Sequence, residues 1–283
     1  MHSSVGSSVR IILSETGATM KLPATTPPES SCMEVLQTAG EIIMENGGET
    51  YRAEETITRM GVGFGLNKVE SFAVPSGLFI SYRGKNGKLE TSVKRVRRLG
   101  RNLSRVDAAN QVSRQVAAGK MNCPQAMEKL KEIKAMPGAF SGWWSLPAAF
   151  LCASGFSALF GGNWLAIGAS GVVALVVQMI EMFLSRFRKR GLTASVIGGM
   201  FTAFLPNLLV LVLPALQTEL VIAGAVMPLV PGLAMTNAVQ DTMRGDMISG
   251  LSHGAQAILT ACLIAGGALL ALDLMKLITG GMV

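Results

Sequence analysis

Four uncharged stretches occupy most of the second half of this 283-residue chain. They lie at 135–180, 191–218, 220–240 and 247–272. A helix needs about 20 mainly apolar residues to cross the hydrocarbon core of a bilayer, and the first stretch is long enough for two crossings. The segments also lack a polar face, which argues against the buried helices of a soluble protein. We therefore predict an α-helical integral membrane domain, with spans at about 143–160, 164–184, 193–214, 219–238 and 250–272.

The charged residues indicate the orientation of these spans. Residues 1–140 hold 19 of the 25 Lys and Arg residues, and the loop between the second and third spans holds four more. Lys and Arg collect in short cytoplasmic loops. If the chain has five spans and its N-terminus is inside, this loop, Arg244 and the basic N-terminal region all lie on the cytoplasmic side. We therefore predict a multi-pass protein whose N-terminal region is cytoplasmic.

The N-terminal region has the alternating pattern of a small α+β domain. Apolar spacing predicts helices at 33–47, 50–60, 100–118 and 124–135, and strands at 69–74, 78–83 and 89–93. Asn86-Gly87 is a strong signal for a hairpin between the last two strands, because both residues tolerate positive φ. The predicted organisation is a disordered tail at 1–32, a cytosolic domain at 33–138 and a transmembrane domain at 139–283. The tail lacks the apolar segment of a secretory signal, and Met20 and Met33 are alternative starts to Met1.

The cysteines predict neither a metal site nor a cofactor. Cys32, Cys123, Cys152 and Cys262 are scattered without the spacing of metal ligands, and the last two fall inside predicted spans. A free Cys in such a place behaves as a small apolar residue. We predict no metal, no cofactor and no functional role for cysteine.

A basic run from Lys94 to Arg105 has three interpretations. If the run is helical, its Lys and Arg side chains lie on one face of the helix. This face is then either solvated or in contact with anionic lipid headgroups. Nucleic-acid binding is the weakest interpretation, because no stacking aromatic residues interleave with the basic ones. We predict no nucleic-acid partner.

Helix breakers and polar residues inside the predicted spans are the candidates for a substrate pathway. Pro228, Pro231 and Gly232 lie within five residues of one another in the fourth span. A helix broken at membrane depth must satisfy its freed carbonyl groups through protein or water, so such breaks often line a cavity. The alternative is a simple proline kink. In the third span, Asn207 lies near the bilayer midplane. Its amide there either forms a structural hydrogen bond within the helix bundle or contacts the substrate.

Asn237, Asp241 and Asp246 follow the broken segment directly. Carboxylates at the membrane edge can bind protons, because desolvation disfavours their charged form. Asp241 and Asp246 are thus candidate proton-coupling groups, and Asn237 is a candidate pathway residue. The alternative for Asp246 is a solvated loop in which it pairs with Arg244. A lone His253 at the start of the fifth span is more typical of a structural residue than of a proton relay.

Two longer motifs resemble those of the threonine/serine exporter family. The first is ETYRAEET at 49–56, preceded by Gly47-Gly48, and its signature positions are Glu49, Thr50, Arg52, Glu54 and Glu55. The second is MPLVPGLAMTNAVQD at 227–241, followed by GD at 245–246 and SGL at 249–251. The resemblance covers about 33–275. It implies a cytosolic N-terminal domain, a bacterial inner-membrane location and proton-driven export of small polar metabolites.

The same resemblance leaves the substrate and the partner open. Longer members of the family carry a second set of about five spans, which this chain lacks. The resemblance therefore implies a second small membrane subunit or assembly with copies of this chain. It favours threonine and serine as substrates, with a C4-dicarboxylate such as succinate as the alternative, since split members are associated with succinate export.

A membrane-anchored enzyme is the alternative from another class. Glu49, Arg52, Glu54 and Glu55 would then supply acid–base chemistry in the 33–138 domain. The sequence contains no recognisable nucleophile–base pair, metal set or phosphate loop, so we predict no catalytic residues and no enzymatic activity.

Overall fold

The computed structural model describes residues 29–84, 87–97, 100–138, 142–186 and 192–279. These residues form two compact units. The N-terminal unit comprises the described residues of Met1–Ala139 together with Thr236–His253, and the helical unit comprises those of Phe140–Met235 and Gly254–Val283. A short segment that the sequence places in and beside the last two spans thus belongs to the N-terminal unit.

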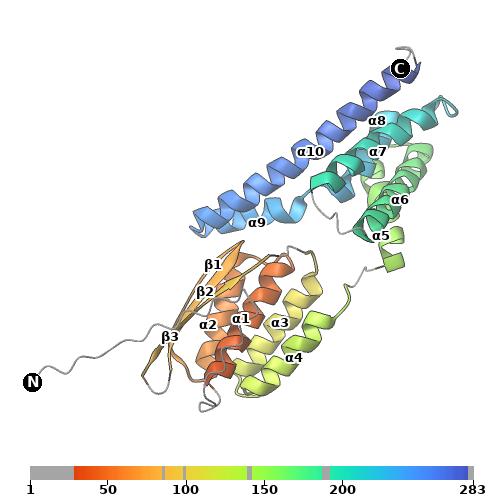
Figure 1. Ribbon diagram of the computed structural model, residues 1–283. Helices are drawn as coiled ribbons and strands as arrows, with labels where there is room; N and C mark the ends of the chain where they lie inside the picture. Colours follow the sequence, from red (N-terminus) through yellow and green to blue (C-terminus); the bar gives the residue numbers. More distant parts are fainter. Residues whose placement is uncertain (1–28, 85–86, 98–99, 139–141, 187–191, 280–283) are drawn as a thin grey trace, which may run out of the picture. The chain divides into compact units, whose positions relative to one another are not determined.

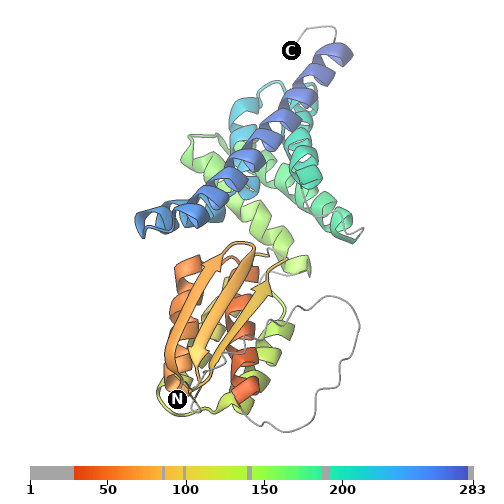
Figure 2. The ribbon, with the colours of Figure 1, turned by 60° about the vertical axis from the view of Figure 1, so that its left-hand side comes forward.

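The N-terminal unit is an α+β domain, as predicted. Its elements are α1 (Glu29–Glu45), α2 (Thr50–Gly63), β1 (Asn67–Val74), β2 (Gly77–Arg83), β3 (Leu89–Arg95), α3 (Leu103–Ala117) and α4 (Cys123–Ala135). The strands form one antiparallel sheet in the order β1-β2-β3. Helices α1 and α2 pack against this sheet, and α3 and α4 pack against α1 and α2 (Figure 1). Figure 2 shows the sheet in front of the helices.

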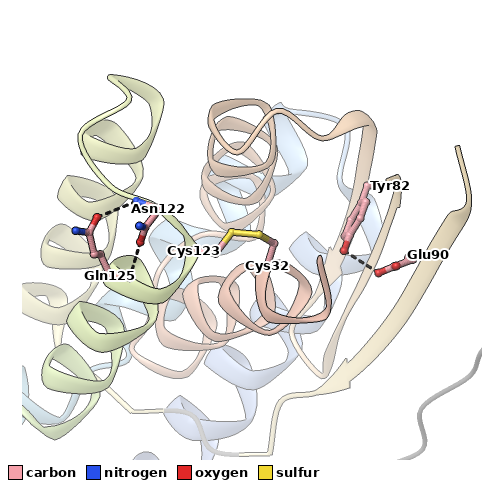
Figure 3. The surroundings of a disulfide bond; sticks show 6 residues. All are labelled: Cys32, Tyr82, Glu90, Asn122, Cys123 and Gln125. Carbon is pink, nitrogen blue, oxygen red and sulfur yellow. Dashed lines mark hydrogen bonds between the residues drawn. A yellow bond between two sulfur atoms is a disulfide. The ribbon is translucent and has the colours of Figure 1, made fainter. Parts of the chain in front are cut away.

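Local signals account for several boundaries in this unit. The β2–β3 hairpin pairs Arg83 with Leu89, and Gly87 in its turn has a φ of 75°. A capping box starts α4, in which Asn122 and Gln125 exchange side-chain and backbone hydrogen bonds (Figure 3). The core beneath the sheet consists of aliphatic side chains from α1, α2 and β2, which are at most 1% exposed: Leu36, Ile43, Ile57, Leu78 and Ile80.

The structure corrects two predictions about this region. Helix α1 begins at Glu29, so the end of the predicted tail is helical, while 1–28 lie outside the described residues. The basic run is not one helical face. Lys94 lies in β3, which pairs with β2, whereas Arg105 lies in α3, where its guanidinium donates to the carbonyl oxygen of Met136. Strand pairing overrides the helical spacing of this run, so the single helix face that both the solvated and the lipid-contact interpretations assumed does not form.

A disulfide joins Cys32 at the start of α1 to Cys123 at the start of α4 (Figure 3). Their Cα atoms are 5.3 Å apart although 91 positions separate them in the sequence. The bond is a structural contact, so the absence of a functional role for cysteine stays a prediction. The spacing offered no signal, because only the packing of α4 against α1 brings the two residues together. In a reducing compartment the same residues would be thiols.

We expect this disulfide to stabilise the oxidised chain. Cys32→Ser should lower the free energy of unfolding by about 2–5 kcal/mol, because the bond closes a long loop and restricts the unfolded state. Denaturant titration of the purified protein with and without reductant measures the difference. Cys262→Ser, which removes an exposed free thiol, is the control. A wild-type stability that does not respond to reductant would contradict the expectation.

The helical unit contains the apolar helices. The elements of this part of the chain are η1 (Gly142–Trp144), α5 (Ser145–Leu159), α6 (Trp164–Arg186), α7 (Leu192–Val210), α8 (Thr218–Val226), η2 (Met227–Leu229), α9 (Gly232–Met243) and α10 (Met247–Thr279). The last two helices begin in one unit and end in the other. A small apolar core, which includes Val173, Val177 and Val221, lies among α6, α7 and α8.

Small residues bring these helices close together. A Cβ atom at Gly224 of α8 would lie 2.7 Å from the backbone oxygen of Ala153 in α5. Serine hydroxyls bridge α5 and α6, since Ser154 donates to the carbonyl oxygen of Ile167 and Ser170 to that of Ala153. Small residues and hydroxyl hydrogen bonds at helix interfaces are typical of membrane proteins.

Among the described residues, three helices are long and apolar enough to cross a membrane. The segments are Trp164–Leu184, Thr193–Val210 and Met247–Ile278. A fourth is present if Thr218–Leu229 and Gly232–Met243, which are bent by 59°, count as one broken span. Helix α5 corresponds to the first predicted span, but its 15 residues reach about 22 Å, less than the hydrocarbon core of about 30 Å. The five-span count therefore stays a prediction.

Candidate functional site

A buried polar cluster in the N-terminal unit centres on Asp241 near the end of α9. The carboxylate is 0% exposed. Its Oδ1 accepts a hydrogen bond of 2.9 Å from the hydroxyl of Thr50, the first residue of α2, and its Oδ2 lies 3.0 Å from Nδ1 of His253 in α10. Thr50 is also fully buried, and His253 is 7% exposed. Helix α2 thus meets the consecutive helices α9 and α10 at one carboxylate, although 191 positions separate Thr50 from Asp241.

This arrangement can hold a proton. An ionised carboxylate only accepts hydrogen bonds, so Nδ1 of His253 must carry a hydrogen when Asp241 is charged. Both side chains are of ionisable types, and water has little access to either. The Asp241–His253 pair is therefore a carboxylate–imidazole hydrogen bond that is shielded from bulk solvent.

A tight turn after α1 connects the same region to Asn237. Gly47 has a φ of 87°, which favours glycine, and Gly48 approaches Ile43 so closely that a Cβ atom would lie 2.5 Å from its Cγ2. The amide of Asn237 donates to the carbonyl oxygen of Gly47 over 3.2 Å. Asn237 lies one helical turn before Asp241 in α9, and its partner is this backbone carbonyl.

The α9–α10 turn contacts α2 through Arg244. The guanidinium carbon of Arg244 lies 3.5 Å from the centre of the Tyr51 ring, a cation–π stacking contact. No ion pair between Arg244 and Asp246 forms in the part of the chain that the structure describes. The turn is exposed at Arg244 and half-buried at Asp246, but these two described residues do not pair.

The signature residues of α2 have separate partners. Glu49 and Arg52 form a two-pronged ion pair with distances of 2.7 and 3.3 Å, and Glu55 pairs with Arg59 one turn later. Glu54 takes no part in these two ion pairs. Its Oε1 accepts a hydrogen bond of 2.6 Å from the backbone N–H of Ala73 in β1.

The position of Glu54 changes its acidity. Burial raises the pKa of the Glu54 carboxyl above its ordinary value, and the charges of Asp246 and Asp241 raise it further, while the hydrogen bond from Ala73 opposes the shift. A carboxyl group with a raised pKa in the folded state contributes stability at low pH, and this contribution is lost as the pH rises through the raised value.

We therefore expect Glu54→Gln to stabilise the protein more at neutral than at acidic pH. The amide oxygen can still accept from Ala73, and the variant no longer carries the half-buried charge. Melting temperatures of the purified full chain between about pH 4 and pH 7.5 test this expectation. A difference between variant and wild type that does not change with pH would contradict it.

The broken helix lies where the sequence predicts it. Pro228 falls in the short helix η2, Pro231 lies in the break, and Gly232 begins α9. Asn207 is buried in α7, but its amide donates to the carbonyl oxygen of Ala203 one turn earlier. This contact is a local one within the helix, so the substrate role of Asn207 stays a prediction.

The structure groups only part of the predicted site. Thr50, Asn237 and Asp241 come together, and Glu54 lies on the next turn of α2. Asn207, Pro228, Pro231 and Gly232 belong to the helical unit. His253 is the functional candidate that the sequence analysis missed, because a single histidine shows no partner until the chain folds. Its placement 12 residues after Asp241, across the turn at Gly245, was the available signal.

Comparisons with known proteins agree on a transporter family. Residues 34–275 match the profile of the family described as "Putative threonine/serine exporter". The match includes both motifs of the candidate site. No solved structure matches the chain.

Three curated relatives carry two different names. Proteins named "Probable succinate transporter subunit YjjP" from Klebsiella aerogenes and Escherichia coli are 25% and 23% identical, over 82% and 83% of this chain and 89% and 91% of their own lengths. A "Probable threonine/serine exporter" from Mycobacterium tuberculosis is 25% identical over 62% of this chain, but the match spans 33% of that longer protein. The family is therefore shared, whereas the named substrates differ.

Proposed function

The chain belongs to the threonine/serine exporter family, and we propose that it is one component of a proton-coupled exporter of threonine and serine in the bacterial inner membrane. The family match and the apolar helices support membrane transport. The observation that carries the proposal is the buried Asp241 carboxylate, held between Thr50 and His253. In this proposal the N-terminal domain is cytoplasmic.

Proton coupling is assigned to the Asp241–His253 pair. A buried pair of titratable groups can bind a proton in one state of a transporter and release it in another. The hydrogen bond from Thr50 ties the charge of Asp241 to the start of α2. A change at this carboxylate would therefore reach α2 directly. Asp246, which is more exposed, is the second candidate group.

The substrate pathway is assigned to the broken helix. Pro228, Pro231 and Gly232 interrupt the apolar segment that leads into Asn237 and Asp241. Such interruptions expose backbone carbonyl groups that can bind a polar substrate. Asn207 is a further pathway residue in this proposal, because a buried amide can exchange its local hydrogen bond for a substrate contact.

A second small membrane subunit is the proposed partner, and assembly with copies of the same chain is the alternative. Two relatives that align over most of their length are named as transporter subunits. Their names also support succinate as the alternative substrate. A catalytic role for the N-terminal domain is not proposed, because Glu49 and Glu55 are already paired with Arg52 and Arg59.

Efflux measurements test the proposal. Cells that express the chain, with and without a candidate partner subunit, are loaded with labelled threonine or succinate. We expect threonine efflux that depends on the chain and on the pH gradient. Succinate efflux without threonine efflux would favour the alternative substrate, and efflux of neither compound with any partner would contradict export.

A further inference from the structure

A cleft of about 640 Å³ opens on the surface of the N-terminal unit, between α2, β1 and the α9–α10 turn. It is separate from the buried carboxylate of Asp241, which is not among its lining residues. Its walls contain a tyrosine, hydroxyl groups and charges of both signs. The residues used below are Tyr51, Glu54, Arg59, Glu70 and Arg244.

The charges in the cleft are not all neutralised by one another. Arg59 is paired with Glu55 on the same helix face. Within the described parts of the chain, Glu54, Glu70 and Arg244 form no ion pair. One cation and two carboxylates therefore remain available to a ligand.

Arg244 is oriented by Tyr51. Its guanidinium carbon lies 3.5 Å from the ring centre, a separation that fits face-to-face stacking. Stacking uses the face of the group and leaves the N–H donors at its edge, which match the two oxygens of a carboxylate. A stacked arginine also loses less conformational freedom on binding, because the ring already restricts it.

Glu54 offers the complementary group. One carboxylate oxygen is held by the N–H of Ala73, which fixes the orientation of the side chain. The other oxygen accepts no hydrogen bond from the described residues. An ammonium group, with three donors and a positive charge, would satisfy this oxygen and compensate for the partial burial of the carboxylate.

The geometry points to a binding site for a free α-amino acid, in which Arg244 binds the carboxylate and Glu54 binds the ammonium group. A dicarboxylate fits poorly, because it would place a second negative charge beside Glu54 and Glu70. The identity of this ligand with the exported substrate rests on the proposed function. The site would then give the amino acid a first contact in the N-terminal domain.

Calorimetric titration of the purified full chain in detergent, with L-threonine and succinate as probes, tests the site. We expect threonine to bind, and succinate to bind at least about tenfold more weakly. Glu54→Gln and Arg244→Gln should each weaken threonine binding by about tenfold or more, because each removes a charge-assisted hydrogen bond. Lys129→Gln, at an exposed ion pair in α4, is the matched control and should bind as the wild type does.

Arg244→Lys separates charge from geometry. The lysine keeps the positive charge but lacks the two parallel N–H donors of the guanidinium group. The affinity of this variant for threonine should therefore lie between those of the wild type and Arg244→Gln. Melting temperatures at or above the wild-type value show that the variants are folded. The site is refuted if threonine gives no binding heat up to about 10 mM, if succinate binds as tightly, or if the folded variants bind unchanged. Threonine binding without any efflux would instead contradict the proposed export function.

Discussion

Asp241→Asn is expected to abolish accumulation driven by a pH difference while it preserves exchange of substrate down its own gradient. The amide oxygen can still accept from Thr50, and the amide nitrogen can donate to Nδ1 of His253 when that atom carries no hydrogen. The shape of the cluster is thus retained and only the carboxylate charge is removed. One pH unit is worth about 1.4 kcal/mol per proton, which supports about tenfold accumulation. In the variant, the ratio of substrate concentrations across the membrane should fall to about one.

The measurement uses proteoliposomes that contain the chain and its partner, with an imposed pH difference. Asp246→Asn is the comparison, because it removes a carboxylate from the same turn without altering the buried hydrogen bonds of Asp241. If pH-driven accumulation survives in Asp241→Asn and is lost in Asp246→Asn, the coupling group is Asp246. Survival in both variants would exclude proton coupling through this turn.

Gly267→Ala is expected to disrupt the packing of α7 against α10, whereas Gly266→Ala is expected to be tolerated. A Cβ atom at Gly267 would lie 2.1 Å from the carbonyl oxygen of Val196, but a Cβ atom at Gly266 would meet nothing within 4 Å. The Gly267→Ala change must force the two helices apart. It should lower the free energy of unfolding by about 3 kcal/mol. The Gly266→Ala change should stabilise α10 by up to about 1 kcal/mol, because alanine favours helix more than glycine does.

The two variants differ by one position in the same helix, so they share composition, expression conditions and distance from the candidate site. Their melting temperatures in detergent and their amounts in the membrane fraction measure the effect. Gly199→Ala should behave like Gly267→Ala, since its Cβ atom would lie 2.1 Å from the carbonyl oxygen of Ile264. Equal stability of Gly266→Ala and Gly267→Ala would show that α7 and α10 do not approach so closely.

The amino-acid sequence by itself determined the features that depend on local patterns. The uncharged stretches identified α6, α7 and α10 as apolar helices, because membrane depth requires a minimum length of apolar sequence. The order of helices and strands before residue 138 followed from periodicity, glycine turns and capping residues. The break at Pro231 followed from the missing backbone donor of proline. The two motifs also identified the family.

Only the tertiary structure decided which of these residues act together. Thr50 and Asp241 are 191 positions apart, and Cys32 and Cys123 are 91 apart, so no local pattern links either pair. His253 looked structural because a lone histidine reveals nothing of the carboxylate beside it. Glu54 was a signature position in the sequence, and its contact with the N–H of Ala73 depends on the packing of strand β1 against α2. The sequence determines where helices begin and end through short-range forces, whereas a shared site depends on burial and hydrogen bonds between segments that only folding brings together.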